Sequence, residues 1–287
     1  AARGAARLDG ARGAVADLQE GHQAGRFAAA GKALAFAADV QFSDRRPMLQ
    51  LEINNREQCV AYYRQLGDLE NTKVSATIVA TRGERLSLQR MDYEGAGGDV
   101  GLSQVSTYDV LELNDAGETT AVIRFDLSAA AAAYAELEAR YEASEESQSN
   151  QAYVALRPFR KALAAFQWDA MASMFAADFI SNDNRKLSLI GPKRGAQEWI
   201  EGNRTLLELA PDTQYRCHQF IPGTRGAYIH GGWYGSRDGG PFEMEINVLV
   251  EFDEQGKIVQ FDNYDDDSAF ASPRWAALGI GAAPLKP

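Results

Sequence analysis

The chain contains an internal repeat whose period is the size of a domain. The segment FAADVQFSDRR at 36–46 returns as FAADFISNDNR at 175–185, and LELNDAGETTAVIRFD at 111–126 returns as VEFDEQGKIVQFDNYD at 250–265. Both second copies begin 139 positions after the first (175 minus 36 and 250 minus 111). Solenoid repeats are shorter, roughly 20–50 residues, whereas ordinary domains hold about 100–150. The 287 residues therefore predict two domains of one duplicated fold.

The predicted domains are flanked and joined by segments of different composition. Residues 1–20 are rich in Ala and Arg and indicate a helical segment, and SEESQSN at 144–150 is a polar linker with nothing to bury. We expect an N-terminal helical segment (1–24), a first domain (25–143), a linker (144–150), a second domain (151–272) and a C-terminal tail (273–287).

Composition and charge narrow the classes of partner. The net charge is −11 and the chain has no cluster of Lys and Arg, so its surface repels phosphate backbones and anionic lipids. No apolar stretch reaches the length of a membrane-spanning helix, and no secretory signal is visible. We therefore expect neither nucleic acid nor a membrane as a partner.

Cysteine and histidine usage points away from a metal centre. Cys59 and Cys217 lie at non-equivalent positions of different repeats, which argues against a disulfide framework and favours the reducing cytoplasm. His22, His218 and His230 form no HxH or HxxxH pair. We expect no metal and no cofactor.

Each copy has helices first and then a run of strands. In the second copy, the hydrophobic pattern predicts helices at 151–166, 168–175 and 196–209 and strands at 179–183, 215–221, 226–234, 242–252 and 257–265. In the first, it predicts helices near 27–38, 54–67 and 128–143 and strands near 40–44, 73–81, 84–94, 102–113 and 119–126. This order is an α+β pattern, with helices packed on a curved, mostly antiparallel sheet.

The order and three motifs resemble the nuclear-transport-factor-2-like fold, also called SnoaL-like or ketosteroid-isomerase-like. The motifs are the FAAD that closes an early helix, the polar strand SNDNR and the ending DEQGKIVQFDNYD. The resemblance covers about 25–143 and 151–270, and it implies two cone-shaped domains with a ligand cavity. That family includes isomerases, dehydratases, epoxide hydrolases, polyketide cyclases and non-catalytic binders. More narrowly, the tandem is similar to paired C-terminal domains of large bacterial cyclase-homology or ATPase signalling proteins.

Asp262 is the sharpest catalytic candidate. In the epoxide-hydrolase branch of that family, an acid stands three residues before the aromatic-Asp ending, as Asp262 stands before Asp265. A carboxyl group in an apolar cone would have a raised pKa and could act as acid or base, assisted by His230 or Tyr264. The branch also carries an Arg-x-Asp on a neighbouring strand, and this chain has Ile229-His230-Gly231 there. The hydrolase mechanism therefore does not transfer, and the first copy has Ile123 in place of the acid.

Other residues are candidates for ligand binding. Asp183 and Arg185 recur as Asp44 and Arg46, which favours a structural ion pair and leaves ligand binding as the alternative. Asp126 and Asp265 also recur and are typical of helix N-caps. His218 lies on a predicted strand, where it could serve as a base or as a hydrogen-bonded structural residue. We expect four aromatic residues either to line an aromatic pocket or to belong to the core: Trp199, Tyr215, Trp233 and Tyr264.

Three functions remain open at this level. The first is a non-catalytic module that binds a small apolar molecule, or another domain or a homodimer partner, as a regulatory part of a larger signalling protein. The second is a cofactor-free isomerase, polyketide cyclase or epoxide hydrolase that acts in the second domain through Asp262. The third is a structural pseudo-dimer that mediates assembly. The absence of a complete catalytic set in the sequence favours the first.

Overall fold

The computed structural model describes residues 35–67, 73–97, 100–186, 192–265 and 268–281 of the chain. The N-terminal helical segment predicted for 1–24, and most of the first predicted helix, lie outside these residues. The chain divides into two compact units, Ala1–Glu142 and Ala143–Pro287, each with its own six-stranded sheet. Among the described residues, no helix combines the length and the apolar character needed to cross a membrane.

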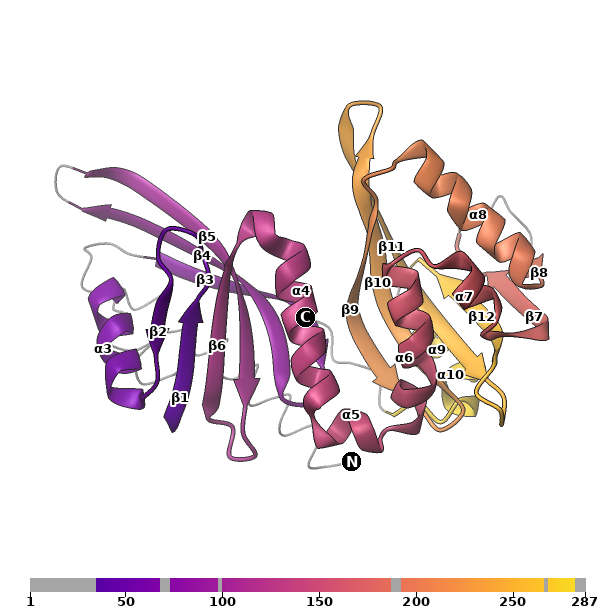
Figure 1. Ribbon diagram of the computed structural model, residues 1–287, viewed down its shortest axis with the longest axis horizontal. Coiled ribbons are helices and arrows are strands. Elements are labelled where there is room, and N and C mark those ends of the chain that lie inside the picture. The colour runs from indigo at the N-terminus through magenta and orange to yellow at the C-terminus, as the bar shows by residue number, and fades with distance from the viewer. Residues whose placement is uncertain (1–34, 68–72, 98–99, 187–191, 266–267, 282–287) are drawn as a thin grey trace. The chain divides into compact units, whose positions relative to one another are not determined.

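In its described part, the first unit has a twisted sheet with one helix before strands β3 to β6 and one after them (Figure 1). The sheet order is β2-β1-β6-β5-β4-β3, and only the pairing of β1 with β6 is parallel among its described strands. Its elements are β1 (Phe36–Asp44), β2 (Leu51–Ile53), α3 (Arg56–Gly67), β3 (Lys73–Arg82), β4 (Leu86–Gly97), β5 (Val100–Leu113), β6 (Thr119–Asp126), a 3-10 turn (Leu127–Ala129) and α4 (Ala130–Ala143). Asp126 caps the 3-10 turn by accepting from the Ser128 amide, which confirms one predicted N-cap.

The second unit repeats this order of sheet strands and also has helices before β7 and after β12. Its sheet order is β8-β7-β12-β11-β10-β9, and β7 pairs with β12 in parallel. Its elements are α5 (Glu145–Ser149), α6 (Gln151–Ala164), α7 (Trp168–Ala172), β7 (Phe175–Asp183), β8 (Lys193–Arg194), α8 (Ala196–Leu209), β9 (Gln214–Pro222), β10 (Gly226–Arg237), β11 (Gly240–Phe252), β12 (Ile258–Tyr264), α9 (Ser268–Ala271) and α10 (Pro273–Ala277). The α+β class and the two copies of one fold are thus confirmed.

The strand register shows that the duplication extends to local irregularities. β1 advances five positions, from Phe36 to Gln41, while its partner β6 advances two, so β1 bulges. β7 makes the same bulge against β12 between Phe175 and Ile180, and each of these residues lies 139 positions after its counterpart. A bulge bends its strand and increases the local twist. Both sheets therefore curve at the same place, and equivalent positions can be assigned residue by residue.

The prediction that FAAD closes a helix in both copies is wrong. Phe36 and Phe175 each begin a strand, and Asp178, predicted to end a helix, lies inside β7. Alanine favours helices, so the local sequence indicates one. The pairing with β6 or β12 overrides this preference, because an extended chain buries Phe36 and Phe42 in one core.

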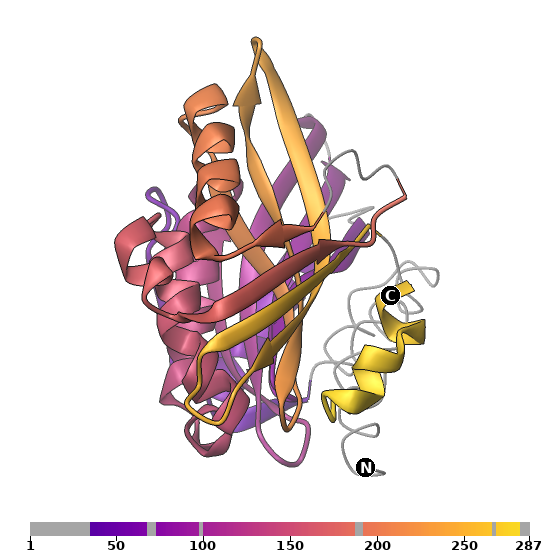
Figure 2. The ribbon, with the colours of Figure 1, turned by 90° about the vertical axis from the view of Figure 1, so that its right-hand side faces the viewer.

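Segments predicted to be irregular are helical. The polar stretch at 144–150 forms α5, which Ser144 caps through the amide of Ser147. The predicted C-terminal tail contains α10, whose Trp275 packs with Tyr228 and Leu249 of the sheet. Figure 2 shows α9 and α10, in yellow, beside the curved sheet of the second unit.

The second unit's sheet has helices on both faces. Phe159 of α6 and Trp199 of α8 contact Phe261 of β12 on one face. Tyr264, three residues further along β12, belongs to the cluster on the other face with α9 and α10. Side chains of a strand alternate between faces, so β12 sends its odd-numbered residues towards α6 and α8. The site described next lies on that face.

Candidate functional site: a cavity in the second unit

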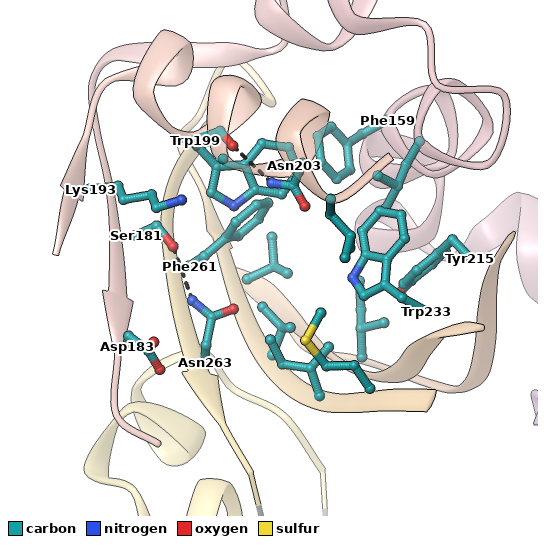
Figure 3. A pocket seen from close by; sticks show the side chains of 18 of the residues that line it. Phe159, Ser181, Asp183, Lys193, Trp199, Asn203, Tyr215, Trp233, Phe261 and Asn263 are labelled. Atoms are coloured by element: carbon teal, nitrogen blue, oxygen red, sulfur yellow. Dashed lines mark hydrogen bonds between the residues drawn. The ribbon is translucent and has the colours of Figure 1, made fainter. Parts of the chain in front are cut away.

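A cavity of about 320 Å³ lies between α6, α8 and the sheet of the second unit (Figure 3). This volume is at the small end of the roughly 300–1,000 Å³ of ligand sites. The lining is mainly apolar, with a few polar groups. It consists of Phe159, Arg160, Leu163, Ser181, Asp183, Arg185, Lys193, Trp199, Gly202, Asn203, Leu206, Tyr215, Ile229, Trp233, Met244, Ile246, Val248, Val250, Phe261 and Asn263.

Aromatic rings form one wall of the cavity. The ring of Phe261 lies 5.5 Å from that of Trp199 and 5.7 Å from that of Phe159, centroid to centroid, in edge-on geometry. The rings of Tyr215 and Trp233 are 5.1 Å apart. The strictly alternating strand β11 supplies the aliphatic floor through Met244, Ile246, Val248 and Val250. Such a surface favours planar apolar groups, which pack against rings without losing hydrogen bonds.

Polar groups gather at the opposite end, where β7 meets the edge strand β8. Asn263 Nδ2 donates to Ser181 Oγ at 3.0 Å and to the carbonyl of Asn182 at 2.8 Å. Lys193 pairs with Ser181 across the strands, and Figure 3 shows its side chain beside the cavity on the same side as Asp183. The cavity is therefore amphiphilic, with an aromatic end and a polar end.

The two recurring Asp–Arg motifs form ion pairs. Arg185 donates to both carboxylate oxygens of Asp183, each at 2.7 Å, and Arg46 does the same with Asp44 in the first unit. Burial raises the pKa of Asp44, but hydrogen bonds from Arg46 outweigh it and hold the pKa below its usual value. In the second unit, the Asp183–Arg185 pair also lines the cavity.

The structure divides the residues predicted from sequence into two groups. Five of them line the cavity: Trp199, Tyr215, Trp233, Asp183 and Arg185. Four do not line it: His218, His230, Asp262 and Tyr264. Asp262 and Tyr264 alternate with Phe261 and Asn263 on β12, so their side chains lie on the other face of the sheet.

Asp262 is held by three neighbours on that other face. Its carboxylate accepts from Asn182 Nδ2 at 2.7 Å, from Gln260 Nε2 at 2.8 Å and from Arg274 Nε at 3.1 Å. Arg274 belongs to α10 and also pairs with Glu251 of β11. The carboxylate therefore fastens the C-terminal helix to the sheet. The expected position of Asp262, inside the cone, is wrong, and its catalytic role stays a prediction without contact to this cavity.

Replacing Asp262 by asparagine is expected to destabilise the second unit by about 1–3 kcal/mol, because a buried hydrogen-bonded charge is lost. Amide hydrogen exchange should rise in residues 268–281, while the affinity of the cavity for an apolar probe should not change. Glu254→Gln, which removes a carboxylate from the exposed turn before β12, is the matched control. Lost binding with unchanged exchange would contradict this assignment.

The two strand histidines belong to a polar cluster on the same outer face. The hydroxyl of Tyr234 donates to Glu245 at 2.9 Å and lies 2.6 Å from His218 Nε2, and His230 Nε2 lies 3.3 Å from Glu245. Burial raises the pKa of Glu245, but the hydrogen bonds from Tyr234 and His230 outweigh it and lower the pKa below its usual value. Glu245 therefore lies within ion-pair distance of both histidines. Within the described residues, no group of three or more His, Cys, Asp or Glu side chains is placed to hold a metal.

Sequence reasoning missed several residues of the lining. The side chains of β12 alternate between the two faces of the sheet. The position of Phe261 and Asn263 in the lining can therefore be deduced once the face of one residue of β12 is known. Lys193 lies in LIGPKRG, which its Gly and Pro mark as a loop, and only the pairing of β8 with β7 places it at the cavity. Arg160 is predicted on a helix, but it is 9% exposed and its guanidinium lies 5.0 Å from the Phe220 ring.

In the first unit, the positions equivalent to the cavity are occupied by large side chains that are buried or half-buried. Val248 pairs with Asn263 in the second unit, and at this place the first unit pairs Asp109 with Arg124. The register assigns five further replacements: Phe42 for Ser181, Ile53 for Lys193, Tyr62 for Gly202, Tyr63 for Asn203 and Tyr93 for Trp233. The helix positions follow because α3 and α8 each begin three residues after Ile53 or Lys193.

These replacements form a polar plug around Arg124, which is 2% exposed. Its guanidinium donates to both oxygens of Asp109, at 3.0 and 2.7 Å, and to the hydroxyls of Tyr62 and Tyr93. It also lies 5.3 Å from the centre of the Phe42 ring. Burial would lower the pKa of Arg124, but the Asp109 carboxylate raises it well above its usual value, so the guanidinium stays charged. The first unit thus fills with an ion pair the region that is a cavity in the second.

Comparison with known proteins finds solved structures that are similar to part of the chain at low sequence identity. No curated protein matches the chain significantly. Among solved structures, an NTF2-like protein from Burkholderia thailandensis is 20% identical, with 40% of this chain and 89% of that chain covered and a TM-score of 0.36. A Mycobacterium tuberculosis protein in complex with estradiol-17beta-hemisuccinate is 12% identical (42% and 97% covered, TM-score 0.36). The BvnE pinacolase from Penicillium brevicompactum is 19% identical (43% and 90% covered, TM-score 0.35).

A family model described as a SnoaL-like domain matches residues 156–261. All cavity-lining residues except Asn263 lie in that range. The part of the chain that contains the cavity is therefore similar to the SnoaL-like domain family.

Proposed function

We propose that the second unit binds a small, largely apolar molecule without chemical turnover, and that the first unit is a structural copy. The observation that carries this proposal is the difference between equivalent positions. The second unit keeps a cavity of about 320 Å³ with an aromatic wall, whereas the first places the Arg124–Asp109 pair and its tyrosines there. This difference supports ligand binding in the second unit.

Binding is favoured over catalysis by the position of the acidic groups. Among the lining residues, Asp183 is the one carboxylate, and both of its oxygens accept from Arg185. A general base must lie within hydrogen-bond reach of the proton that it abstracts, and the lining residues include no histidine beside this carboxylate. Asp262, the sequence candidate, is engaged by Arg274 on the other face of the sheet. We extend the proposal to a regulatory role within a larger signalling protein, which rests on the sequence resemblance alone.

The proposal is tested by looking for a bound molecule and by closing the cavity. Native mass spectrometry of the purified protein should detect a bound small apolar molecule. If none is bound, the protein should take up one member of a panel of small aromatic compounds. Ser181→Phe should abolish uptake, because Phe42 at the equivalent position of the first unit is fully buried against Tyr62. Ser236→Phe adds the same ring at an exposed position of β10 and should leave uptake unchanged.

Two results would contradict the proposal. One is uptake that Ser181→Phe leaves unchanged, because the molecule would then bind elsewhere. The other is turnover of an epoxide, enone or polyketide substrate that Ser181→Phe abolishes, which would make the cavity an active site.

A further inference from the structure

Cationic side chains outnumber carboxylates in the lining of the cavity, although the protein as a whole is acidic. Its charged lining residues are Arg160, Arg185 and Lys193 against Asp183, which leaves an excess of positive charge, while the whole chain carries −11. Charges in a water-poor site interact more strongly than charges in solvent. The field inside the cavity therefore favours an anionic group over a neutral or cationic one.

Arg185 and Lys193 differ in how their charges are balanced. Arg185 forms a two-point ion pair with Asp183, so the protein itself supplies its counter-charge. For Lys193, the described part of the chain provides neither a hydrogen bond nor an ion pair to the ammonium. The segment LSLIG at 187–191, close before it in sequence, contains no carboxylate either. A half-buried ammonium beside apolar walls is a group that an anionic partner stabilises.

The fold makes room for this ammonium. A Cβ atom built on Gly202 of α8 would lie 2.0 Å from Lys193 Nζ, so a larger residue there would displace it. The first unit has Ile53 and Tyr62 at these two positions. The unit that has the cavity therefore combines a glycine at position 202 with a lysine at position 193.

We propose that the ligand is an apolar ring system carrying one carboxylate, with the carboxylate on Lys193 and the rings against Phe261 and Trp233. This inference rests on the proposed binding function and names the chemical class of the ligand. Lys193 donates from the polar end, beside Ser181 and Asn263, and the aromatic wall takes the hydrocarbon. An acid of this shape matches both ends of the cavity at once.

The test compares 2-naphthoate with its neutral counterpart 2-naphthamide by calorimetric titration of the full chain at pH 7. We expect the acid to bind more tightly than the amide. Lys193→Met should weaken binding of the acid by about 10- to 100-fold, as expected for a hydrogen bond to a charged group, and leave the amide unchanged. Gly202→Ala should also lower the affinity for 2-naphthoate, because the methyl group of the alanine displaces the ammonium of Lys193.

Lys257→Met is the matched control, because it removes a cation of the same unit whose ammonium donates to the Ser173 carbonyl outside the cavity. It should not change the affinity for the acid. Equal binding of acid and amide to the unmodified protein would overturn the carboxylate assignment and leave apolar binding intact. Binding of neither probe, nor of any molecule in the aromatic panel, would overturn the proposed function as well. The comparison on the unmodified protein holds even if a variant fails to fold.

Discussion

Asp109→Asn is expected to destabilise the first unit by about 3–5 kcal/mol, the usual cost of removing one partner of a buried ion pair. The substitution keeps the shape of the side chain and removes its charge. It leaves the guanidinium of Arg124, 2% exposed, with two tyrosine hydroxyls and an aromatic face but without the carboxylate that accepts its hydrogen bonds. The measurement is native-state hydrogen exchange of the amides in β5 and β6, which reports the free energy of opening of this unit alone.

An exposed pair in the same unit supplies the control. Arg90 and Asp92 form an ion pair on β4 at 3.0 Å, and the Arg90 side chain is 47% exposed. Asp92→Asn should therefore cost less than about 1 kcal/mol. The double change Arg124→Met with Asp109→Leu should cost less than Asp109→Asn, because it leaves no charge behind. Equal costs for Asp92→Asn and Asp109→Asn would show that the plug does not stabilise the unit.

Phe261→Ala is expected to destabilise the second unit by about 3–5 kcal/mol, the range for deleting a buried aromatic ring. Phe261 is 4% exposed, and its ring has the rings of Phe159, Trp199 and Phe179 around it at 5.2–5.7 Å. Removing it joins its space to the existing cavity. Hydrogen exchange of β11 and β12 should show the loss, and bulkier apolar probes should bind more tightly.

A smaller change at the same position separates packing from cavity size. Phe261→Leu keeps most of the apolar volume and should cost clearly less than Phe261→Ala. A loss confined to β12, without faster exchange in α8, would contradict the role of Phe261 as the link between the sheet and the helices.

Much of the fold follows from patterns that the sequence displays openly. The repeat predicts two copies, and the alternation of Met244, Ile246, Val248 and Val250 predicts the apolar face that lines the cavity. The start of β7 does not follow, since the helix preference of FAAD is local, whereas its pairing with β12 comes from residues more than 80 positions away. Propensity is a weak prior where tertiary contacts compete with it.

The candidate site is harder to predict because it depends on which face each strand turns inwards. On β12, Asp262 faces the side of the sheet opposite to Phe261 and Asn263, so an error of one residue changes the predicted face. The spacing from Asp265 identifies an acid but does not show that its side chain lies on the outer face. The aromatic residues Trp199, Tyr215 and Trp233 were easier, because large rings are mostly buried wherever they lie. Lys193 depends on a two-residue strand, and so short a pairing leaves no periodic signal in the sequence.

The plug in the first unit also has a historical consequence. Asp109 and Arg124 hold each other in place, so a change at either position alone passes through a protein that has lost several kcal/mol. Most domains have a total stability of only about 5–15 kcal/mol. Losing the pair by single substitutions therefore requires an unstable intermediate protein. A domain copy that has acquired such a pair cannot easily regain a cavity at this place. Two side chains, Asp109 and Arg124, therefore maintain the difference between the two halves of this chain.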